Sequence, residues 1–243
     1  SGPLVYGQPG IEWLGPLAGV IAGEEPEKGH MESNTLETRL QKAPIVPLVA
    51  PEDMDSAIQT TRALVEGGLS VVEVVLRTPA AIDCLEEIAD AVPDSIIGAG
   101  TVLSEDQARA VIDKGARFIV MPGLYVPAVE VAQEGGVPVY PGISTATEAQ
   151  RAWNLGLRVM KFFPASLARG TAMLKAIGSV FKDVKFMPTG GITAGNLAEY
   201  LELPNVLACG GSWLTPKDAI RDGDYEVIRK LAAEAVSIGQ SVG

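Results

Sequence analysis

The feature that most limits the possible folds is a series of short apolar runs along almost the whole chain. Each run is apolar or rich in β-branched residues, and consecutive runs begin about 19 to 26 residues apart, the length of one strand plus one crossover helix. The eight runs are IVPLVA from Ile45, VVEVVL from Val71, IIGAGTV from Ile96, FIVMPG from Phe118, VPVYPG from Val137, RVMKFFP from Arg158, VKFMPTGG from Val184 and VLACGGS from Val206. This alternation predicts a parallel sheet covered by helices.

The intervals between the runs carry the start signals of amphipathic helices. SEDQARAVIDKG opens with Ser104 as an expected N-cap, and STATEAQRAWNLG opens with Ser144 or Thr145. The interval after the first run is expected to start its helix at Pro51. Eight strands alternating with helices predict an α/β protein with a single-domain (β/α)8 TIM barrel. An open doubly wound sheet is the alternative, although no change in composition marks a second domain.

Residues 1–30 do not fit this pattern. Gly29-His30-Met31 is typical of a cloning junction, so residues 1–30 are expected to be an added or flexible N-terminal extension, with a native extension as the alternative. Residues 31–243 are expected to form the barrel. Glycines and Glu12 interrupt the apolar part of the extension, and no basic segment precedes it, so neither a signal peptide nor a membrane span is expected.

The composition limits the possible partners. The formal net charge of −11 argues against nucleic acid and anionic membrane, but it allows a small anionic substrate bound by a few local donors. Cys84 and Cys209 give no disulfide framework, so both thiols are expected to be reduced in a cytoplasmic protein. His30 is the only histidine, which leaves few ligands for zinc. No metal or cofactor is expected, and a magnesium site formed by Asp and Glu is the alternative that no motif supports.

A lysine in the middle of the sixth run is the most unusual residue of the sequence. Val159, Met160, Phe162 and Phe163 surround Lys161 in a segment typical of a strand buried on both faces. Burying an ammonium is costly unless it is paired or loses its proton. Apolar surroundings disfavour the charged form, and a neutral amine attacks a ketone to form an imine. The pattern therefore predicts Schiff-base carbonyl chemistry, most often used to break carbon–carbon bonds.

Two charged residues of the second run share one strand face. Side chains alternate along a strand, so Glu73 and Arg77 lie on one face, as do Val159, Lys161 and Phe163 in the sixth run. If both faces line the barrel lumen, Glu73 lies near the level of Lys161, and Arg77 lies roughly 13 Å nearer the mouth. A carboxyl group there can move protons during imine formation. A purely structural Lys–Glu pair is the alternative, although such pairs are costly to assemble.

Several further residues of the sequence are suited to binding anionic groups of a substrate. The planar guanidinium of Arg77 is expected to hold a carboxylate beside the ketone, with Thr101 adding a hydroxyl; a salt-bridged rim arginine is the alternative. PTGGI and CGGSWL both expose glycine backbone after the last two runs, where this fold commonly binds phosphate. A phosphate site is therefore predicted there, and two ordinary tight turns are the alternative. The GAG at residues 98–100 is too short for a dinucleotide fingerprint.

Taken together, six segments resemble the 2-keto-3-deoxy-6-phosphogluconate (KDPG) aldolase family, which includes 2-keto-4-hydroxyglutarate (KHG) aldolases. They are VVEVVLRTPAA, IGAGTVLSEDQ, VPVYPGIST, KFFPAS, PTGGI and GGSWL, in the expected order between Thr35 and Ser241. The resemblance implies a homotrimer of (β/α)8 barrels and a class I aldolase of the Entner–Doudoroff pathway. Such an enzyme splits KDPG into pyruvate and glyceraldehyde 3-phosphate without a metal, and some members split KHG into pyruvate and glyoxylate.

The resemblance also implies a role for each matching residue. Lys161 would be the Schiff-base lysine and Glu73 the general acid and base. The remaining assignments are Arg77, Thr101 and the backbone near Pro122 for the pyruvate carboxylate, Phe163 beside the imine, and Gly190, Gly191 and Ser212 for the phosphate. The role of Pro122 comes from the resemblance alone.

One segment departs from the family pattern. Many members continue KFFPA with an acidic residue and a glycine pair, whereas this chain has Ser166 to Gly170. Arg169 is either an added anion contact or a solvated residue at a helix start. The preference among KDPG, its galactonate epimer and KHG therefore stays open.

Two other functions remain possible at this point. A barrel that isomerises or cyclises phosphosugars would share the phosphate loops but form no covalent adduct with pyruvate. A non-catalytic barrel could serve as an assembly scaffold. The trimer rests on the resemblance alone.

Overall fold

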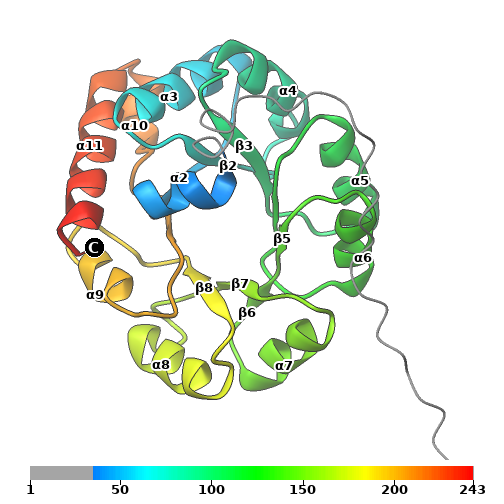
Figure 1. Cartoon of the computed structure of the whole chain (residues 1–243). Helices are drawn as coiled ribbons and strands as arrows, with labels where there is room; N and C mark the ends of the chain where they lie inside the picture. Colours follow the sequence, from blue (N-terminus) through cyan, green and yellow to red (C-terminus); the bar gives the residue numbers. More distant parts are fainter. Residues whose placement is uncertain (1–34, 243) are drawn as a thin grey trace, which may run out of the picture.

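The computed structural model describes residues 35–242, in which parallel strands alternate with helices (Figure 1). The strands are β1 (Ile45–Val49), β2 (Val71–Val75), β3 (Ile96–Gly100), β4 (Ile119–Val120), β5 (Val139–Tyr140), β6 (Gly142–Ile143), β7 (Val159–Phe162), β8 (Lys185–Pro188) and β9 (Cys209–Gly211). The expected extension at residues 1–30, with His30, lies outside the described residues.

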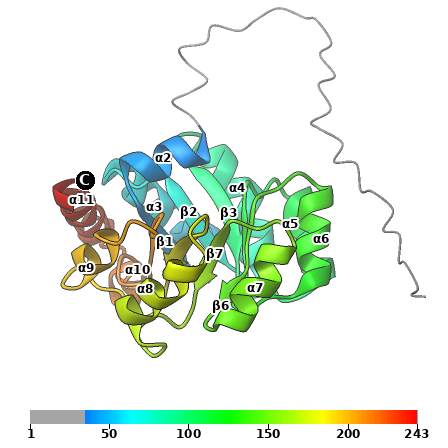
Figure 2. The same ribbon diagram turned by 60° about the horizontal axis from the view of Figure 1, so that its bottom comes forward.

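The helices surround the strands. They are α2 (Leu36–Lys42), α3 (Met54–Glu66), α4 (Ala81–Ala91), α5 (Glu105–Asp113), α6 (Val126–Glu134), α7 (Ala146–Asn154), α8 (Gly170–Val180), α9 (Leu197–Leu201), α10 (Lys217–Arg221) and α11 (Tyr225–Val242). All except α2 form an outer ring in Figure 1, and α2 lies across one end of the strands, as the turned view in Figure 2 also shows. Within residues 35–242, no helix is long and apolar enough to cross a membrane.

The strands form a curled parallel sheet in two hydrogen-bonded groups. One group has the order β5-β4-β3-β2-β1-β9, and the other has the order β6-β7-β8. The groups approach each other at both ends, because only Pro141 separates β5 from β6 and isolated parallel bridges join Phe186 to Val206 and Thr189 to Gly210. The predicted α/β architecture with a parallel sheet is therefore confirmed.

The fifth apolar run differs from the single strand that its sequence predicts. Pro141 interrupts it, because proline has no N–H for a sheet ladder. Before the proline, β5 pairs with β4; after it, β6 pairs with β7. The carbonyl of Pro141 still accepts a hydrogen bond of 2.9 Å from the Lys161 N–H, so the break redirects the ladder towards the strand that carries the lysine.

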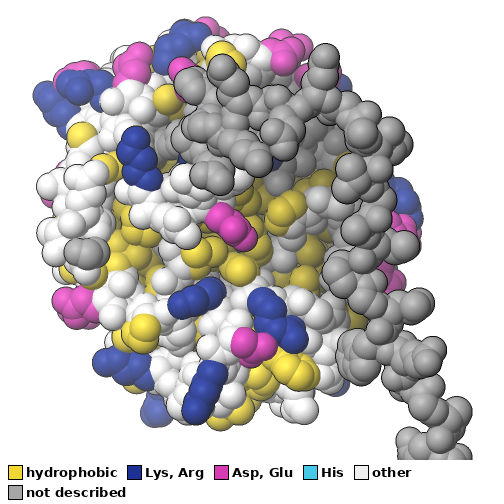
Figure 3. Space-filling view, in the orientation of Figure 1, with side chains coloured by type: hydrophobic (Ala, Val, Ile, Leu, Met, Phe, Trp, Pro, Cys, Tyr) yellow, Lys and Arg dark blue, Asp and Glu magenta, His cyan; other side chains and the backbone are white. Residues whose placement is uncertain are grey.

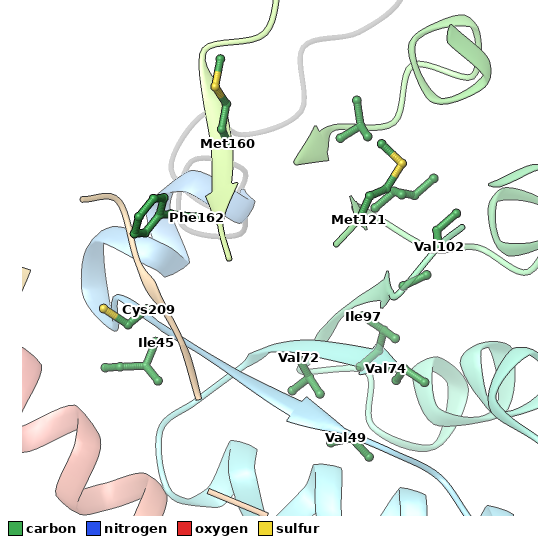
Figure 4. Packing of buried hydrophobic residues seen from close by; sticks show 14 of the residues in the cluster. Ile45, Val49, Val72, Val74, Ile97, Val102, Met121, Met160, Phe162 and Cys209 are labelled. Carbon is green, nitrogen blue, oxygen red and sulfur yellow. The ribbon is translucent and has the colours of Figure 1, made fainter. Parts of the chain in front are cut away.

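The two faces of the sheet belong to separate cores. Val72, Val74, Met160 and Phe162 pack in the cluster between the strands and the helices, as Figure 4 shows. The expectation that Met160 and Phe162 face the helices is confirmed. Alternate residues of the same strands point the other way, which leaves Glu73 and Lys161 on the inner face. Both cysteines are buried free thiols.

The helix that precedes β1 was not predicted from the sequence, and it fills one end of the lumen. Figure 3 shows hydrophobic side chains at the centre of the face across which α2 lies. Leu40 of α2 packs in a second buried cluster with inner-face residues from six strands or their ends. Its other members are Val46, Val71, Phe118, Val120, Tyr140, Met187 and Ala208. This packing leaves the opposite, C-terminal end of the strands for polar groups.

The helix start signals were read correctly at two of three places. Ser104 caps α5 by accepting from the Gln107 N–H, and Thr145 caps α7 in a reciprocal capping box. The expected start at Pro51 was wrong. Asp53 is the N-cap of α3, because its carboxylate accepts a hydrogen bond of 2.9 Å from the Ser56 N–H.

We expect Leu40→Ala to lower the free energy of unfolding by about 2–5 kcal/mol, because it leaves a cavity where the lumen is closed. Leu40 is 1% exposed, whereas Leu167 in the loop after β7 is 84% exposed. Leu167→Ala is therefore the matched control, with little expected change. Urea unfolding measures both variants, and equal effects would contradict a role for α2 in sealing the lumen.

Candidate active site

The centre of the inner face is a buried ion pair between β7 and β2. Lys161 Nζ lies 3.4 Å from Glu73 Oε1, and the two side chains are 5% and 2% exposed. The expectation that these residues lie at one level of the lumen is confirmed. Burial removes water from both charges, so each depends on the other and on the walls around it.

Two glycines of β3 create the space for this carboxylate. β3 is the register neighbour of β2, with Gly98 opposite Glu73. A methyl group on Gly100 would overlap Glu73 Oε1, and one on Gly98 would overlap the Phe118 ring. The GAG segment therefore makes room within the lumen. The sequence does contain a signal for this space, because Ile96, Gly98 and Gly100 alternate on the inner face of β3. The prediction from the sequence did not use it.

An aromatic ring forms the wall beside the ammonium. Lys161 Nζ lies 5.5 Å from the centroid of the Phe163 ring, within the range of a cation–π contact. The same ring lies against Gly190, since a Cβ built there would stand 3.5 Å from Phe163 Cδ2. The predicted neighbour of the imine thus connects the lysine to the first glycine of PTGGI.

Thr101 and Pro122 lie at the C-terminal ends of β3 and β4. Thr101 has φ 59°, a left-handed conformation that is an outlier for a β-branched residue and costs about 1–3 kcal/mol. The backbone carbonyl of Pro122 lies against Gly142, where a methyl group would overlap it. Gly142 is the register partner of Lys161. Both predicted carboxylate-binding positions therefore adjoin the strands that hold the ion pair.

The last two loops meet where phosphate binding was predicted. Gly190 and Gly191 have φ 97° and 79°, values that L side chains rarely adopt, so the turn presents bare backbone. Thr189 bridges to Gly210, which brings the end of β8 next to β9. Thr189 is itself a buried hydroxyl on the inner face, and the sequence reading missed it although it shares parity with Met187.

Arg77 and Ser212 are exposed and line one cavity of about 760 Å³ at the ends of β1, β2 and β9. This volume is typical of small-molecule sites. The cavity lining does not include Lys161, Glu73 or Thr101. Arg77 forms no ion pair with any residue in the described range, so the rim salt bridge considered from the sequence is absent there.

These features define an α/β protein with a lysine–carboxylate pair inside a curled parallel sheet, and with bare glycine backbone and exposed polar side chains at the C-terminal end of that sheet. Within residues 35–242, no three His, Cys, Asp or Glu side chains are grouped so that they could hold a metal ion.

Comparisons with known proteins identify the family. The family model for KDPG and KHG aldolases matches residues 36–231. The KHG/KDPG aldolase of Escherichia coli K12 is 46% identical over 200 residues, which cover 82% of this chain and 94% of that protein. The chain therefore belongs to the KDPG and KHG aldolase family, and the resemblance drawn from the sequence is confirmed.

Solved structures agree with this result. KDPG aldolase from Legionella pneumophila, with pyruvate captured at low pH as a covalent carbinolamine intermediate, is 40% identical with a TM-score of 0.79, covering 82% of this chain and 97% of that one. KDPG aldolase from Zymomonas mobilis ZM4, solved with 3-phosphoglycerate, is 37% identical with a TM-score of 0.78, covering 85% of this chain and 97% of that one.

We expect Gly100→Ala to destabilise the protein by about 1–3 kcal/mol, because the added methyl group must displace the Glu73 carboxylate from Lys161. Gly195→Ala is the matched control, since its added Cβ would stand 3.8 Å from the nearest atom, Thr193 Oγ1. Chemical denaturation compares the two. An unaltered stability for Gly100→Ala would show that the carboxylate does not depend on this space.

Proposed function

We propose that this chain is a class I aldolase that cleaves KDPG to pyruvate and glyceraldehyde 3-phosphate, with KHG, giving pyruvate and glyoxylate, as a second substrate. The reaction is a step of the Entner–Doudoroff pathway. The observation that carries the proposal is the buried Lys161–Glu73 pair, with Nζ and Oε1 3.4 Å apart, in a member of an aldolase family.

The reaction begins when Glu73 accepts a proton from the Lys161 ammonium, which leaves a neutral amine beside the Phe163 wall. Lys161 Nζ then attacks the C2 carbonyl carbon of the substrate and forms a carbinolamine. Glu73 returns a proton to the hydroxyl, water leaves, and a protonated imine forms. Lys161 Nζ and Glu73 Oε1 lie 3.4 Å apart within a direct hydrogen bond, so the proton can pass between them without an intermediate.

Cleavage uses the imine as an electron sink. The C4 hydroxyl loses its proton to the Glu73 carboxylate, the C3–C4 bond breaks, and its electron pair moves into the C2–C3 bond to give an enamine. The C4 fragment leaves as the aldehyde. Protonation of the enamine at C3 by Glu73 regenerates the imine, and its hydrolysis releases pyruvate and the free lysine.

The two ends of the substrate bind to different donors. Arg77, Thr101 and the backbone at Pro122 hold the carboxylate next to C2, and the backbone of Gly190 and Gly191 with the Ser212 hydroxyl binds the phosphate. Three observations support these roles: the adjoining positions of Thr101 and Pro122, the bare backbone of the glycine turn, and the lack of an ion pair between Arg77 and any of residues 35–242. Holding both ends positions C2 against Lys161.

The proposal includes a closed eight-stranded (β/α)8 barrel in residues 31–243 and a cytoplasmic enzyme that needs no metal or cofactor. The bridges between β8 and β9 and the shared run of β5 and β6 support closure of the sheet.

Incubation with pyruvate followed by borohydride is expected to leave a reduced pyruvyl group on Lys161, located by peptide mass spectrometry. Lys161→Met should abolish the adduct, and Glu73→Gln should slow its formation by about 10²–10⁴-fold, the usual contribution of a general acid–base group. Lys185→Met is the control, because Lys185 is a strand lysine on neighbouring β8 but is exposed.

The adduct is read only on variants whose circular dichroism matches the parent, because removing one member of a buried pair is destabilising. A folded parent protein that forms no adduct would exclude the class I mechanism and favour a phosphosugar isomerase or a scaffold.

We further propose a homotrimer. Exposed apolar side chains after the adjacent strands β3 and β4, namely Leu103, Tyr125 and Val126, are consistent with a subunit interface. Light scattering is expected to give about three times the mass of one chain. A monomeric mass at micromolar concentration would contradict the trimer.

A further inference from the structure

The cavity that contains Arg77 and Ser212 holds another cation, Lys217, that the reaction above does not use. The cavity lies over the C-terminal ends of β1, β2 and β9, next to α10. Its polar lining includes Arg77, Thr78, Ser212, Thr215 and Lys217. Ser212 and Lys217 both belong to the segment after β9, so the last predicted phosphate contact and this ammonium share one wall.

A hydrogen bond holds this segment over the end of β1. Thr215 Oγ1 donates to the backbone carbonyl of Leu48 at 2.7 Å, and α10 begins at Lys217 directly after Pro216. The base of the Lys217 side chain is therefore fixed relative to the sheet. Lys217 itself is exposed, so its ammonium can reach a ligand that enters from solvent.

The cations of this cavity differ in their partners. Arg221 Nη1 lies 2.7 Å from Asp218 Oδ1, and Arg221 Nε lies 2.9 Å from Asp222 Oδ1, so its charge is already engaged. Lys217 and Arg77 form no ion pair with any residue between 35 and 242. With Arg77 on the substrate carboxylate, Lys217 is the cation of this cavity that remains for the anion at the other end.

We propose that Lys217 is a specificity-determining residue that binds the substrate phosphate from the side of Ser212 away from the glycine turn. This inference rests on the proposed aldolase function. A phosphate dianion gains more from an ammonium than a single carboxylate does, and KHG is also a shorter molecule. Lys217 therefore favours KDPG and its phosphorylated epimer over KHG.

Carboxylates on another part of the lining limit where a phosphate can bind. Glu52, Asp53 and Asp55 line the cavity from the segment between β1 and α3. Asp53 is held by the Ser56 N–H and hydroxyl at 2.9 and 2.7 Å, and the backbone hydrogen bond in particular keeps the pKa of this carboxyl below its usual range. These charges repel a phosphate, so the favourable position lies between Ser212 and Lys217.

The test compares kcat/KM for KDPG with kcat/KM for the same keto acid without phosphate, 2-keto-3-deoxygluconate. Lys217→Met is expected to lower kcat/KM for KDPG about tenfold, mainly through KM, because a charge-assisted hydrogen bond is lost. The value for the unphosphorylated acid should not change. Lys217→Arg should retain most of the selectivity, and added salt should reduce the difference between the Lys217→Met variant and the parent.

Arg221→Met is the matched control, since it removes a cation from the same cavity whose charge is already paired. An equal loss on both substrates would show a structural role for Lys217 and overturn the proposal, and so would unchanged kinetics with KDPG. Trapping of pyruvate on Lys161 separates the two proposals. If the parent forms the adduct but Lys217→Met keeps its selectivity, only the Lys217 proposal fails; if the parent forms none, both fail.

Discussion

The buried pair of Lys161 and Glu73 is the constraint on which the rest of the site depends. Moving an ammonium and a carboxylate out of water costs several kcal/mol per ion, and their attraction offsets this only if the geometry is held closely. The neighbouring residues hold this geometry. Gly100 leaves the carboxylate its space, Gly142 lets the backbone at Pro122 approach the strand beside Lys161, and Phe163 covers the ammonium. The apolar environment that makes the pair costly also makes proton transfer between its members useful.

Because side chains alternate along each strand, one small sheet can hold a packed core on one face and a reactive site on the other. Residues of one parity pack against the helices, and those of the other parity fill the lumen, where Leu40 and Phe118 occupy the N-terminal part. The polar groups are thereby confined to the centre and the C-terminal end of the lumen. A well-packed frame can hold a strained residue such as Thr101, whose left-handed backbone would otherwise relax.

The sequence was sufficient for most features that depend on local pattern, although the start of α3 was expected at Pro51 and lies after Asp53. The strand runs, the facing of Glu73 and Lys161, and the caps at Ser104 and Thr145 all follow from periodicity and side-chain chemistry. Features that depend on approach through space were missed. Nothing local shows that Gly100 faces a carboxylate or that the helix at Leu36–Lys42 closes the lumen. Pro141 was visible, but its effect on pairing required both neighbouring strands.

A protein with a net charge of −11 can still bind a substrate with two anionic ends, because charge acts here over short distances. The Debye length at physiological salt is about 8 Å, so acids on distant helices are screened while groups within the cavity are not. Binding of an anion therefore depends on which charged side chains of the cavity already have a partner within the protein. Arg221 is paired within its own helix region and Asp53 is held by the start of α3, whereas Arg77 and Lys217 are unpaired with any of residues 35–242. In the proposed mode of binding, this cavity offers one such cation to each end of the substrate, and the distance between those ends then sets which keto acid fits both.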